Sequence, residues 1–573
     1  MKTEIPGIVF IYLLTVLLAM LLGKYIARVF NGEKTWLDFM APLERLIFRL
    51  SGIDVRQEMS WKQHLVAMLT INLIWFVFAF FCLRFQGYLP LNPDHNPNQS
   101  PDLAFNTAIS FLVNCNLQDY SGETGATYFT QTFIFMFLHF VSAATGIAAM
   151  MVVFKAMKEQ ITTKLGNFWQ NLVLSITRIL LPLSLLVAVF LVFNGTPSSY
   201  IGKATYINLQ GDTAHVSRGP AAAMIAIKQI GTNGGGWFGA NSAHPLENPN
   251  YYTNIVECMS ITLIPMALVF ALGYYLKRRK LSWVIFGVMT LGFLLVLIPS
   301  INSEIRGNPY LATLGISQPG GSMEGKEVRL GPAASAYWSI CTTVTSNGSS
   351  NAMHDSMMPI TGAMQLFGMM VNSLYGGVGV GYLNFYIFMI IAVFISGLMV
   401  GRTPEFLGRK IEAREMKIAT LVALLHPFLI LQGTAMASYI WLNFAHVHWA
   451  VQPAKWLNNP GYHGFTEILY QFTSSSANNG SSYAGLSANT VFWNLSTGLV
   501  MILGRFLPII GPVAIAGLMA NKKFIPESAG TLKTDTATFG IMILAVIVII
   551  AALSFFPALA LGPVSEYLSI PKN

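Results

Sequence analysis

Ten apolar segments, separated by polar stretches, constrain this chain more than any other feature. A helix needs about 20 apolar residues to cross a bilayer at 1.5 Å per residue. Charged residues make up only 10% of the sequence, against about 25% in soluble domains. The sequence therefore predicts an all-α polytopic membrane protein with about ten transmembrane helices. We expect them near 8–22, 65–85, 128–153, 179–195, 253–276, 281–300, 382–401, 418–438, 490–519 and 538–561.

The basic residues predict the orientation of these helices. A secretory signal peptide carries its positive charge before the apolar core, whereas Lys24 and Arg28 follow the first segment, so we expect an uncleaved helix. Cytoplasmic loops are rich in Lys and Arg. Most of the 34 basic residues lie on the side that the first helix reaches, which predicts that both termini are outside. They lie in 24–62, 155–178, 277–280, 402–417 and 522–533.

Composition also excludes several classes of function. The net charge of +9 comes without a basic cluster interleaved with aromatic residues, so we expect membrane lipid and no nucleic acid as a partner. The cysteines form no CxxC pair and predict neither a zinc site nor a disulfide framework. They are Cys82, Cys115, Cys258 and Cys341.

Four short polar stretches on the predicted outer side interrupt the apolar pattern. The most unusual, 231–249, reads GTNGGGWFGANSAHPLENP and has three consecutive glycines, whose missing Cβ atoms let backbone approach a partner closely. The others are NCNLQ at 114–118, SNGSSN at 346–351 and NNGSS at 478–482. Each follows a short apolar or amphipathic run that we interpret as a pore helix, namely 103–113, 221–230, 333–343 and 466–472.

This order predicts four pseudo-repeats of helix, pore loop and helix around a central pore, with one extra helix at each end. The segment 360–375 runs into the glycine-rich 376–381, and we take it with 382–401 as one helix interrupted by a glycine loop. The expected units are the extra helix 1–30, repeats 63–155, 178–280, 281–404 and 417–523, and the extra helix 536–563.

Irregular backbone at membrane depth is tolerated where it lines a watery cavity, and rings of carbonyl oxygens replace the hydration shell of K⁺. The loops hold no ring of Asp or Glu, which argues against Ca²⁺ or Mg²⁺. For any single loop other than 231–249, an ordinary external turn is the alternative. The candidate filter residues are Asn114, Cys115, Asn116, Gln118, Thr232, Asn233, Gly234, Ser346, Asn347, Gly348, Asn478, Asn479 and Gly480.

Two further features are candidates for control of the pore. Arg505 lies about 17 residues before Lys522, nearly a full crossing from the interface, so we expect an intramembrane charge rather than snorkelling. A positive charge beneath the filter would limit passive cation flow. The glycine loop with Gly376, Gly377 and Gly379 is either a packing kink or a gate across the pore.

Several motifs together resemble a known family. They are 231–249, AMHDS at 352–356, GRTPEFLGRK at 401–410 and ANNGSSYAGL at 477–486. The chain resembles, nearly end to end, the potassium-binding component of Kdp-type potassium-transporting ATPases, which is the A subunit of those complexes. That family belongs to a superfamily of potassium transporters with four helix–pore-loop–helix repeats.

The resemblance implies high-affinity K⁺ uptake across a bacterial inner membrane, with ATP hydrolysed by a separate P-type catalytic component, the B subunit. It also implies two smaller components, the C and F subunits, and a tunnel that carries K⁺ to the catalytic component. In agreement, the chain has neither a DKTGT nor a GxxxxGK[ST] motif, so we expect a non-catalytic protein that binds K⁺ and no nucleotide. The filter residues and Arg505 match the family's ion site and intramembrane arginine.

Three positions depart from the family pattern. Cys115 stands where Thr is frequent, Ala477 stands near an expected Asn, and Asn372 replaces an acidic residue before the glycine loop. The last change puts an ion pair between that loop and Arg505 in doubt.

A stand-alone K⁺ channel or an ion-coupled K⁺ transporter on the same plan is the alternative function. An intramembrane enzyme would need clustered acid/base or metal ligands. His354 and Asp355 lack such spacing, and we expect a structural hydrogen bond there.

Overall fold

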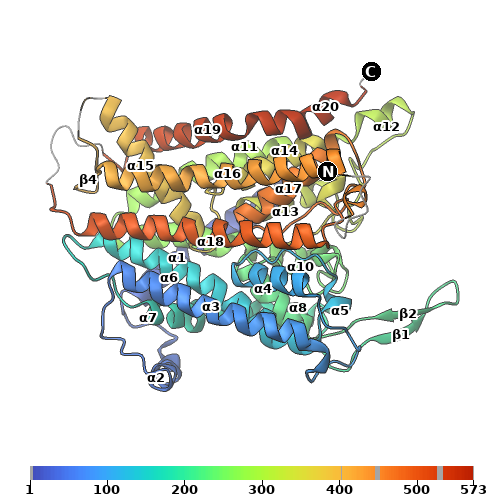
Figure 1. Ribbon diagram of the computed structural model, residues 1–573, viewed down its shortest axis with the longest axis horizontal. Helices are drawn as coiled ribbons and strands as arrows, with labels where there is room; N and C mark the ends of the chain where they lie inside the picture. Colours follow the sequence, from blue (N-terminus) through green and yellow to red (C-terminus); the bar gives the residue numbers. More distant parts are fainter. Residues whose placement is uncertain (1–3, 400, 402, 445–451, 526–532, 572–573) are drawn as a thin grey trace.

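The computed structural model describes residues 4–399, 401, 403–444, 452–525 and 533–571. Ten helical segments within this part are long and apolar enough to cross a membrane, which confirms the predicted class. They run together as a bundle of nearly aligned helices (Figure 1). The segments are Glu4–Phe30, Trp61–Tyr88, Thr130–Lys158, Phe168–Phe193, Tyr251–Tyr275, Arg279–Thr313, Val380–Met399, Ala413–Phe444, Val491–Ala520 and Ala537–Ser569.

The burial of these segments shows which of them lies at the centre. In Thr130–Lys158, 89% of the most apolar window is buried, against 22% in Glu4–Phe30. The helix α6 therefore forms the core, while α1 and α3 present apolar side chains outward, as lipid-facing helices do. The main helices of these segments are α1 Glu4–Phe30, α3 Trp61–Phe85, α6 Met136–Lys158, α8 Leu181–Phe193, α10 Tyr251–Tyr275, α11 Arg279–Arg306, α15 Val380–Met399, α16 Ala413–Phe444, α18 Val491–Ala520 and α19 Ala537–Leu559. The span that contains α8 begins with α7 Phe168–Leu174 and continues through Ser175–Leu180.

Four short helices lie inside the bundle instead of crossing it. They are α4 Pro101–Leu112, α9 Ala221–Ile230, α13 Pro332–Val344 and α17 Tyr462–Ala477. A helix of 13 residues such as α13 is only about 20 Å long, too short to span the apolar layer. Their side chains are almost all buried. Each ends at one of the four polar stretches.

The helix α17 is longer than its predicted range of 466–472. The serine run at its end looks like a loop in sequence, but the hydroxyls of Thr473 and Ser475 donate to the carbonyls of Leu469 and Gln471 at 2.7 Å. Bonds of this kind satisfy the hydroxyl inside a helix. The helix therefore continues to Ala477.

The predicted glycine-interrupted helix is present as two separate helices. The first, α14, spans Pro359–Val371 and ends because Asn372 takes the left-handed conformation with φ 46°. The second, α15, begins at Val380. Some predicted positions lie outside the described residues. They are residues 1–3 of the first expected unit, residue 400 near the end of the expected span 382–401, Arg402 among the predicted cytoplasmic charges, and 445–451 of the fourth expected repeat.

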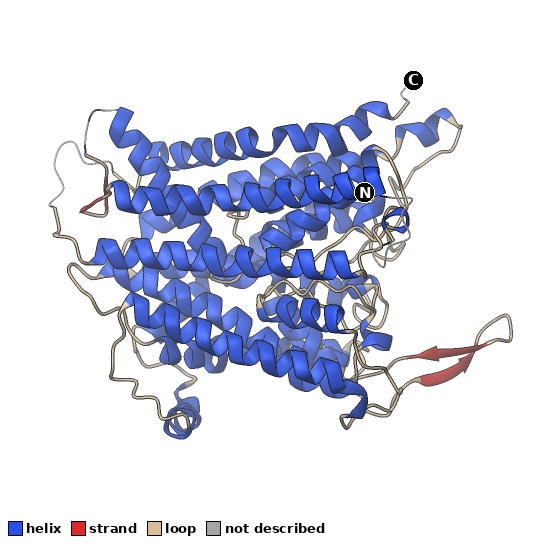
Figure 2. Ribbon diagram, in the orientation of Figure 1, coloured by secondary structure: helices blue, strands red, loops and turns tan. Residues whose placement is uncertain are grey.

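The remaining elements lie at the two ends of the bundle. An exposed antiparallel hairpin, β1 Ala204–Ile207 with β2 Thr213–Val216, projects from the end at which α1 begins and α20 finishes (Figures 1 and 2). The sequence pattern did not predict it. The others are α2 Ala41–Leu50, α5 Gly122–Gly125, α12 Pro309–Thr313, α20 Ser565–Ser569, and the short pair β3 Glu405–Phe406 and β4 Arg409–Lys410.

Candidate ion-binding site

The four polar stretches share one backbone conformation over three residues. We call these triplets loop 1 (114–116), loop 2 (232–234), loop 3 (346–348) and loop 4 (478–480). The first residue of each has a positive φ of 50–63°, the third has a positive φ of 56–96°, and the middle one does not. Alternation of this kind turns successive carbonyl groups towards the same side of the chain. Gly occupies the third position in loops 2, 3 and 4, where positive φ costs it nothing.

The amide groups of the loops point back to the short helices. The N–H groups of Asn116 and Gly234 donate to the carbonyls of Ser110 and Lys228 at 3.0 and 3.2 Å. Those of Asn347 and Asn479 donate to Thr342 and Ser474 in the same way, at 3.0 and 2.9 Å. These four backbone donors are thus used behind the loops.

The four loops meet in a closed ring, although each is more than 100 residues from the next in sequence. A Cβ atom on Gly234 would overlap the carbonyl oxygen of Asn347, and one on Gly348 would overlap that of Asn479. A Cβ on Gly480 would likewise overlap the carbonyl oxygen of Cys115. Loop 1 contacts loop 2 through Asn114, whose Nδ2 donates to the carbonyl of Thr232 at 2.7 Å.

The middle carbonyl of every loop is buried without a donor. Cys115, Asn233, Asn347 and Asn479 are fully buried, and no hydrogen bond reaches their carbonyl oxygens from any described residue. A buried carbonyl without a partner is costly. Four such carbonyls on loops that contact one another, with no carboxylate in the loops, are neutral oxygen groups of the kind that coordinates a dehydrated monovalent cation.

Side-chain amides hold the ring together on its outer circumference. Asn347 in loop 3 donates to the carbonyl of Lys228 in α9 at 3.1 Å, and Asn479 in loop 4 donates to that of Thr342 in α13 at 2.8 Å. Loops 3 and 4 are each thereby bonded to the short helix that precedes the previous loop in sequence. Cys115, at the same position of loop 1, has no amide with which to form this bond.

Loop 2 has an additional charged support that the sequence reasoning missed. Lys228 and Glu247 form a fully buried ion pair at 2.9 Å. Lys228 also donates to Asn241 Oδ1 at 2.7 Å, and Asn241 Nδ2 donates to the carbonyl of Gly234 at 2.8 Å. The sequence carries a signal for this ion pair. Lys228 lies just before the 231–249 block and Glu247 lies within it, and charged residues in an apolar setting are usually paired.

Gln118 braces the ring from outside. Its side chain accepts from the amide of Gly236 at 2.8 Å and donates to the carbonyl of the same residue at 3.2 Å. The next residue, Asp119, lies with Gln118, Gly239 and Ser482 on the wall of a groove at this end of the bundle. Burial raises the pKa of Asp119 to about 7.

The glycine loop lies directly behind the ring. Val378 donates its amide to the hydroxyl of Thr232 at 3.0 Å. A Cβ atom on Gly379 would overlap the backbone of Gly146 in α6, and both Gly376 and Gly379 have positive φ values of 67° and 79°. Close approach and backbone conformation therefore both require glycine here.

Arg505 is buried in α18 on the same side of the ring, with an exposed fraction of 4%. Its Nη2 donates to the carbonyl of Ser142 at 3.0 Å, and the Ser142 hydroxyl donates to Asn114 Oδ1 at 2.8 Å. Asn372 does not pair with Arg505. It accepts from the Ser346 hydroxyl at 2.9 Å and donates to the carbonyl of Ala477 at 3.4 Å.

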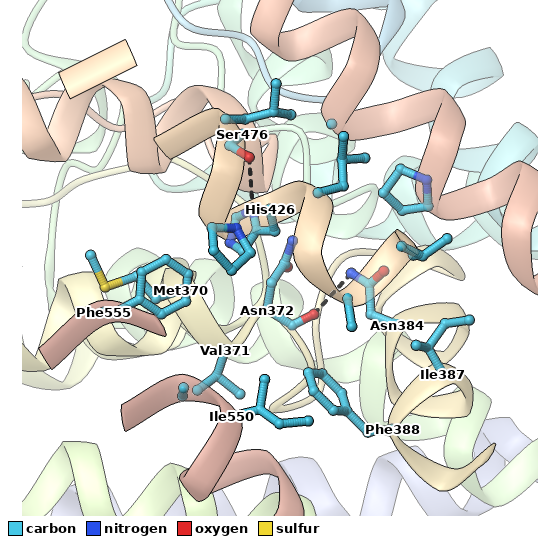
Figure 3. A pocket seen from close by; sticks show the side chains of 18 residues that line it. Met370, Val371, Asn372, Asn384, Ile387, Phe388, His426, Ser476, Ile550 and Phe555 are labelled. Carbon is cyan, nitrogen blue, oxygen red and sulfur yellow. Dashed lines mark hydrogen bonds between the residues drawn. The ribbon is translucent and has the colours of Figure 1, made fainter. Parts of the chain in front are cut away.

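A mostly apolar cavity lies next to Asn372 (Figure 3). Within it His426 is directed towards Ser476, which it contacts at 2.7 Å. Asn384 donates to the carbonyl of Asn372 at 3.0 Å. The rest of the wall is largely aliphatic and aromatic, so the cavity offers a cation far fewer oxygen ligands than the ring does.

Comparison with known proteins agrees with the resemblance seen in the motifs. Residues 9–568 match the family described as potassium-transporting ATPase A subunit. The chain is 63% identical, over the full length of both proteins, to the potassium-transporting ATPase potassium-binding subunit of Flavobacterium psychrophilum. It is 50% identical to the protein of the same name from Alicyclobacillus acidocaldarius, covering 99% of this chain and 100% of that protein.

The crystal structure of the potassium transporter TrkH from Vibrio parahaemolyticus also overlaps, with 13% identity, a TM-score of 0.48, and coverage of 87% of this chain and 96% of that one. The sequence matches by themselves show the family. The chain belongs to the family of potassium-transporting ATPase A subunits.

Proposed function

We propose that this chain is the K⁺-selecting membrane component of an ATP-driven potassium uptake complex, and that loops 1 to 4 are its selectivity filter. The observation that carries the proposal is the set of four buried carbonyls, of Cys115, Asn233, Asn347 and Asn479, that lack a donor among the described residues. A cation in the ring would supply the missing partner for all four. The loops contribute no charge, which favours a monovalent ion.

The assembly is part of the same proposal. The relatives are named potassium-binding subunits of a potassium-transporting ATPase, which supports a complex in which another chain hydrolyses ATP. We infer that this chain passes K⁺ to that P-type catalytic chain, the B subunit, in a complex that also holds the C and the small F subunits. The membrane is then the bacterial inner membrane, with both termini outside, as the distribution of basic residues indicates.

Arg505 then limits passive flow through the filter. The residue is buried behind the ring, on the side of the glycine loop, and its fixed positive charge opposes a cation that leaves the filter towards it. Arg505→Gln should increase ATP-independent K⁺ flux in liposomes. Unchanged passive flux in this variant, with normal K⁺ binding, would assign the arginine a purely structural role.

The decisive experiment is ATPase activity of the detergent-solubilised complex, purified through a tag on this chain and titrated with K⁺ and with Na⁺. We expect activation by low K⁺ and none by Na⁺ at the same concentrations. If no ATPase co-purifies and the isolated chain conducts K⁺ in liposomes, the protein is instead a channel or ion-coupled transporter. Equal activation by both ions would contradict the assignment of the ring as a K⁺ filter.

A further inference from the structure

Four titratable side chains meet where α17 begins and α20 lies, away from the ring itself. Asp355 follows loop 3, His463 and Glu467 lie on the first turns of α17, and Glu566 lies on α20. His463 Nε2 is 2.9 Å from Asp355 Oδ1 and 4.0 Å from Glu467 Oε1. One donor atom from each of Asp355, His463 and Glu467 lies within 4.8 Å of the other two.

The cluster has an excess of carboxylates. Asp355, Glu467 and Glu566 surround a single imidazole, and no Lys or Arg in the described part of the chain forms an ion pair with any of them. Glu467 is fully buried. Its Oε1 accepts a bond from Asn459 at 3.3 Å, but its Oε2 has no hydrogen-bond partner among the described residues. An unpartnered buried carboxylate oxygen in such a group calls for a cation.

The imidazole is oriented in the way that metal-binding histidines are. His463 Nδ1 is 2.8 Å from Glu566 Oε1, so that this nitrogen donates its proton to the carboxylate. Nε2 faces Asp355 and Glu467, and without a metal it donates to Asp355 Oδ1 at 2.9 Å. A metal ion bound between the two carboxylates would displace this proton and take the Nε2 lone pair. A carboxylate behind a histidine ligand fixes the tautomer and raises the basicity of the ligand.

We propose that Asp355, His463 and Glu467 form a Zn²⁺ site, with Glu566 as the carboxylate that orients His463. Zinc accepts histidine nitrogen and carboxylate oxygen ligands, with a water completing a tetrahedral set, and its bonds of about 2.0–2.2 Å place neighbouring ligand atoms ~3.3 Å apart. Such mixed N/O sites bind Zn²⁺ more tightly than Mn²⁺. The His463 side chain is 20% exposed, which gives the ion access from solvent.

The site would connect four segments of the chain. Asp355 Oδ2 also accepts from the amide of Gly485, a few residues after loop 4, at 2.9 Å, and Glu566 belongs to the last helix. A bound ion would thus fasten α17 and α20 to the segments that follow loops 3 and 4. This inference goes beyond the proposed transport function, and its test uses no potassium.

The test is Zn²⁺ binding by the purified full chain in its complex, with a histidine-free tag, after removal of metal by a chelator. A chromophoric zinc chelator as competitor reports the affinity, and metal analysis after desalting reports the stoichiometry. We expect one ion per chain in the wild type and at least about a tenfold weaker affinity in His463→Gln and Glu467→Gln. Glu566→Gln should weaken binding by about tenfold, as loss of an orienting carboxylate does.

His215→Gln is the matched control, because His215 lies on the exposed hairpin, where its Nδ1 contacts the hydroxyl of Thr205 at 3.2 Å. This variant should bind zinc as the wild type does. Zinc should raise the unfolding temperature of the wild type and of the control, but not that of His463→Gln. Without metal, all three proteins should unfold at the same temperature, which would show that the variants are folded. Absence of binding in the wild type, or equal binding by His463→Gln, would overturn the proposal and leave an ion-pair network.

Discussion

Loop 1 and the other three loops reach the same backbone conformation with different side chains. Loops 2, 3 and 4 each read Asn-Gly at the middle and third positions, whereas loop 1 reads Cys115-Asn116. In loops 3 and 4 the middle Asn ties the loop to a neighbouring helix. In loop 1 the first residue provides the tie, since Asn114 contacts Thr232 and accepts from Ser142.

The four loops of the ring therefore share their backbone geometry but not the bonds that support it. If the carbonyls bind the ion, any support that holds the carbonyls in place is sufficient. Substitutions should therefore matter in proportion to what they do to the backbone. The effects of substitution should be largest where an added side chain would overlap the carbonyl oxygen of a neighbouring loop.

The largest effect is expected at the third position of loop 2. Gly234→Ala, and still more Gly234→Asp, places a Cβ against the carbonyl oxygen of Asn347 at a φ of 83°. The left-handed conformation alone costs an L-residue about 1–2 kcal/mol, and the overlap forces the carbonyl to move. We expect the K⁺ concentration for half-maximal ATPase activation to rise by about 100-fold or more, with loss of selectivity over Na⁺.

Gly287→Ala is the control for this substitution, because Gly287 lies within α11 and a Cβ there meets no atom within 4 Å. Its K⁺ activation should equal that of the wild type. Normal K⁺ affinity and selectivity in Gly234→Ala would count heavily against the ring as the filter.

An intermediate effect is expected at the middle position, and it should differ between loops. Asn479→Ala removes the 2.8 Å bond to the Thr342 carbonyl and also the acceptor of the buried Ser481 amide at 3.0 Å. A buried amide left without a partner costs about 1–3 kcal/mol. This corresponds to roughly tenfold or more in apparent K⁺ affinity, at about 1.4 kcal/mol per tenfold. Cys115→Ala removes no such bond and should change the affinity by less than about threefold. Equal losses in the two variants would contradict the difference in support between loops 4 and 1.

A smaller effect concerns the groove next to loop 1. Burial raises the pKa of Asp119 to about 7, so the side chain is mostly neutral at about pH 6 and mostly charged at about pH 8. A negative charge in the groove attracts K⁺, and the apparent affinity should therefore rise by a few-fold over this range. In Asp119→Asn this dependence should disappear, while Asp212→Asn, on an exposed turn of the hairpin, should keep it. A pH profile that is unchanged in Asp119→Asn would assign the dependence to another group.

The smallest effect is expected from Asn116→Gly, which gives loop 1 the third residue of the other loops. Asn116 already has a φ of 56°, and both polar atoms of its side-chain amide lack partners among the described residues. Glycine adopts this backbone without strain, so the K⁺ activation curve should shift by no more than about twofold. A tenfold loss would mean that the Asn116 side chain itself contacts the ion or its water.

Local sequence determined the class, the ten spans and the position of the four short helices. Apolar length and turn composition are local properties, and they are visible without knowledge of any partner. The full length of α17 was missed because the hydroxyls of Thr473 and Ser475 bond to carbonyls four residues back, a choice that also depends on burial. The unit boundaries of the expected repeats remain predictions.

Only the tertiary structure decided which groups meet. Lys228 with Glu247, Asn372 with Ser346, and Arg505 with Ser142 are pairs that no spacing rule singles out. Asp355 and His463 are separated by 108 residues in sequence, so no metal-ligand spacing was visible there. Periodicity describes how one segment faces its surroundings, whereas a site depends on which distant segments supply those surroundings. The physical reason is that side-chain chemistry acts over a few ångströms in space, whatever the distance along the chain.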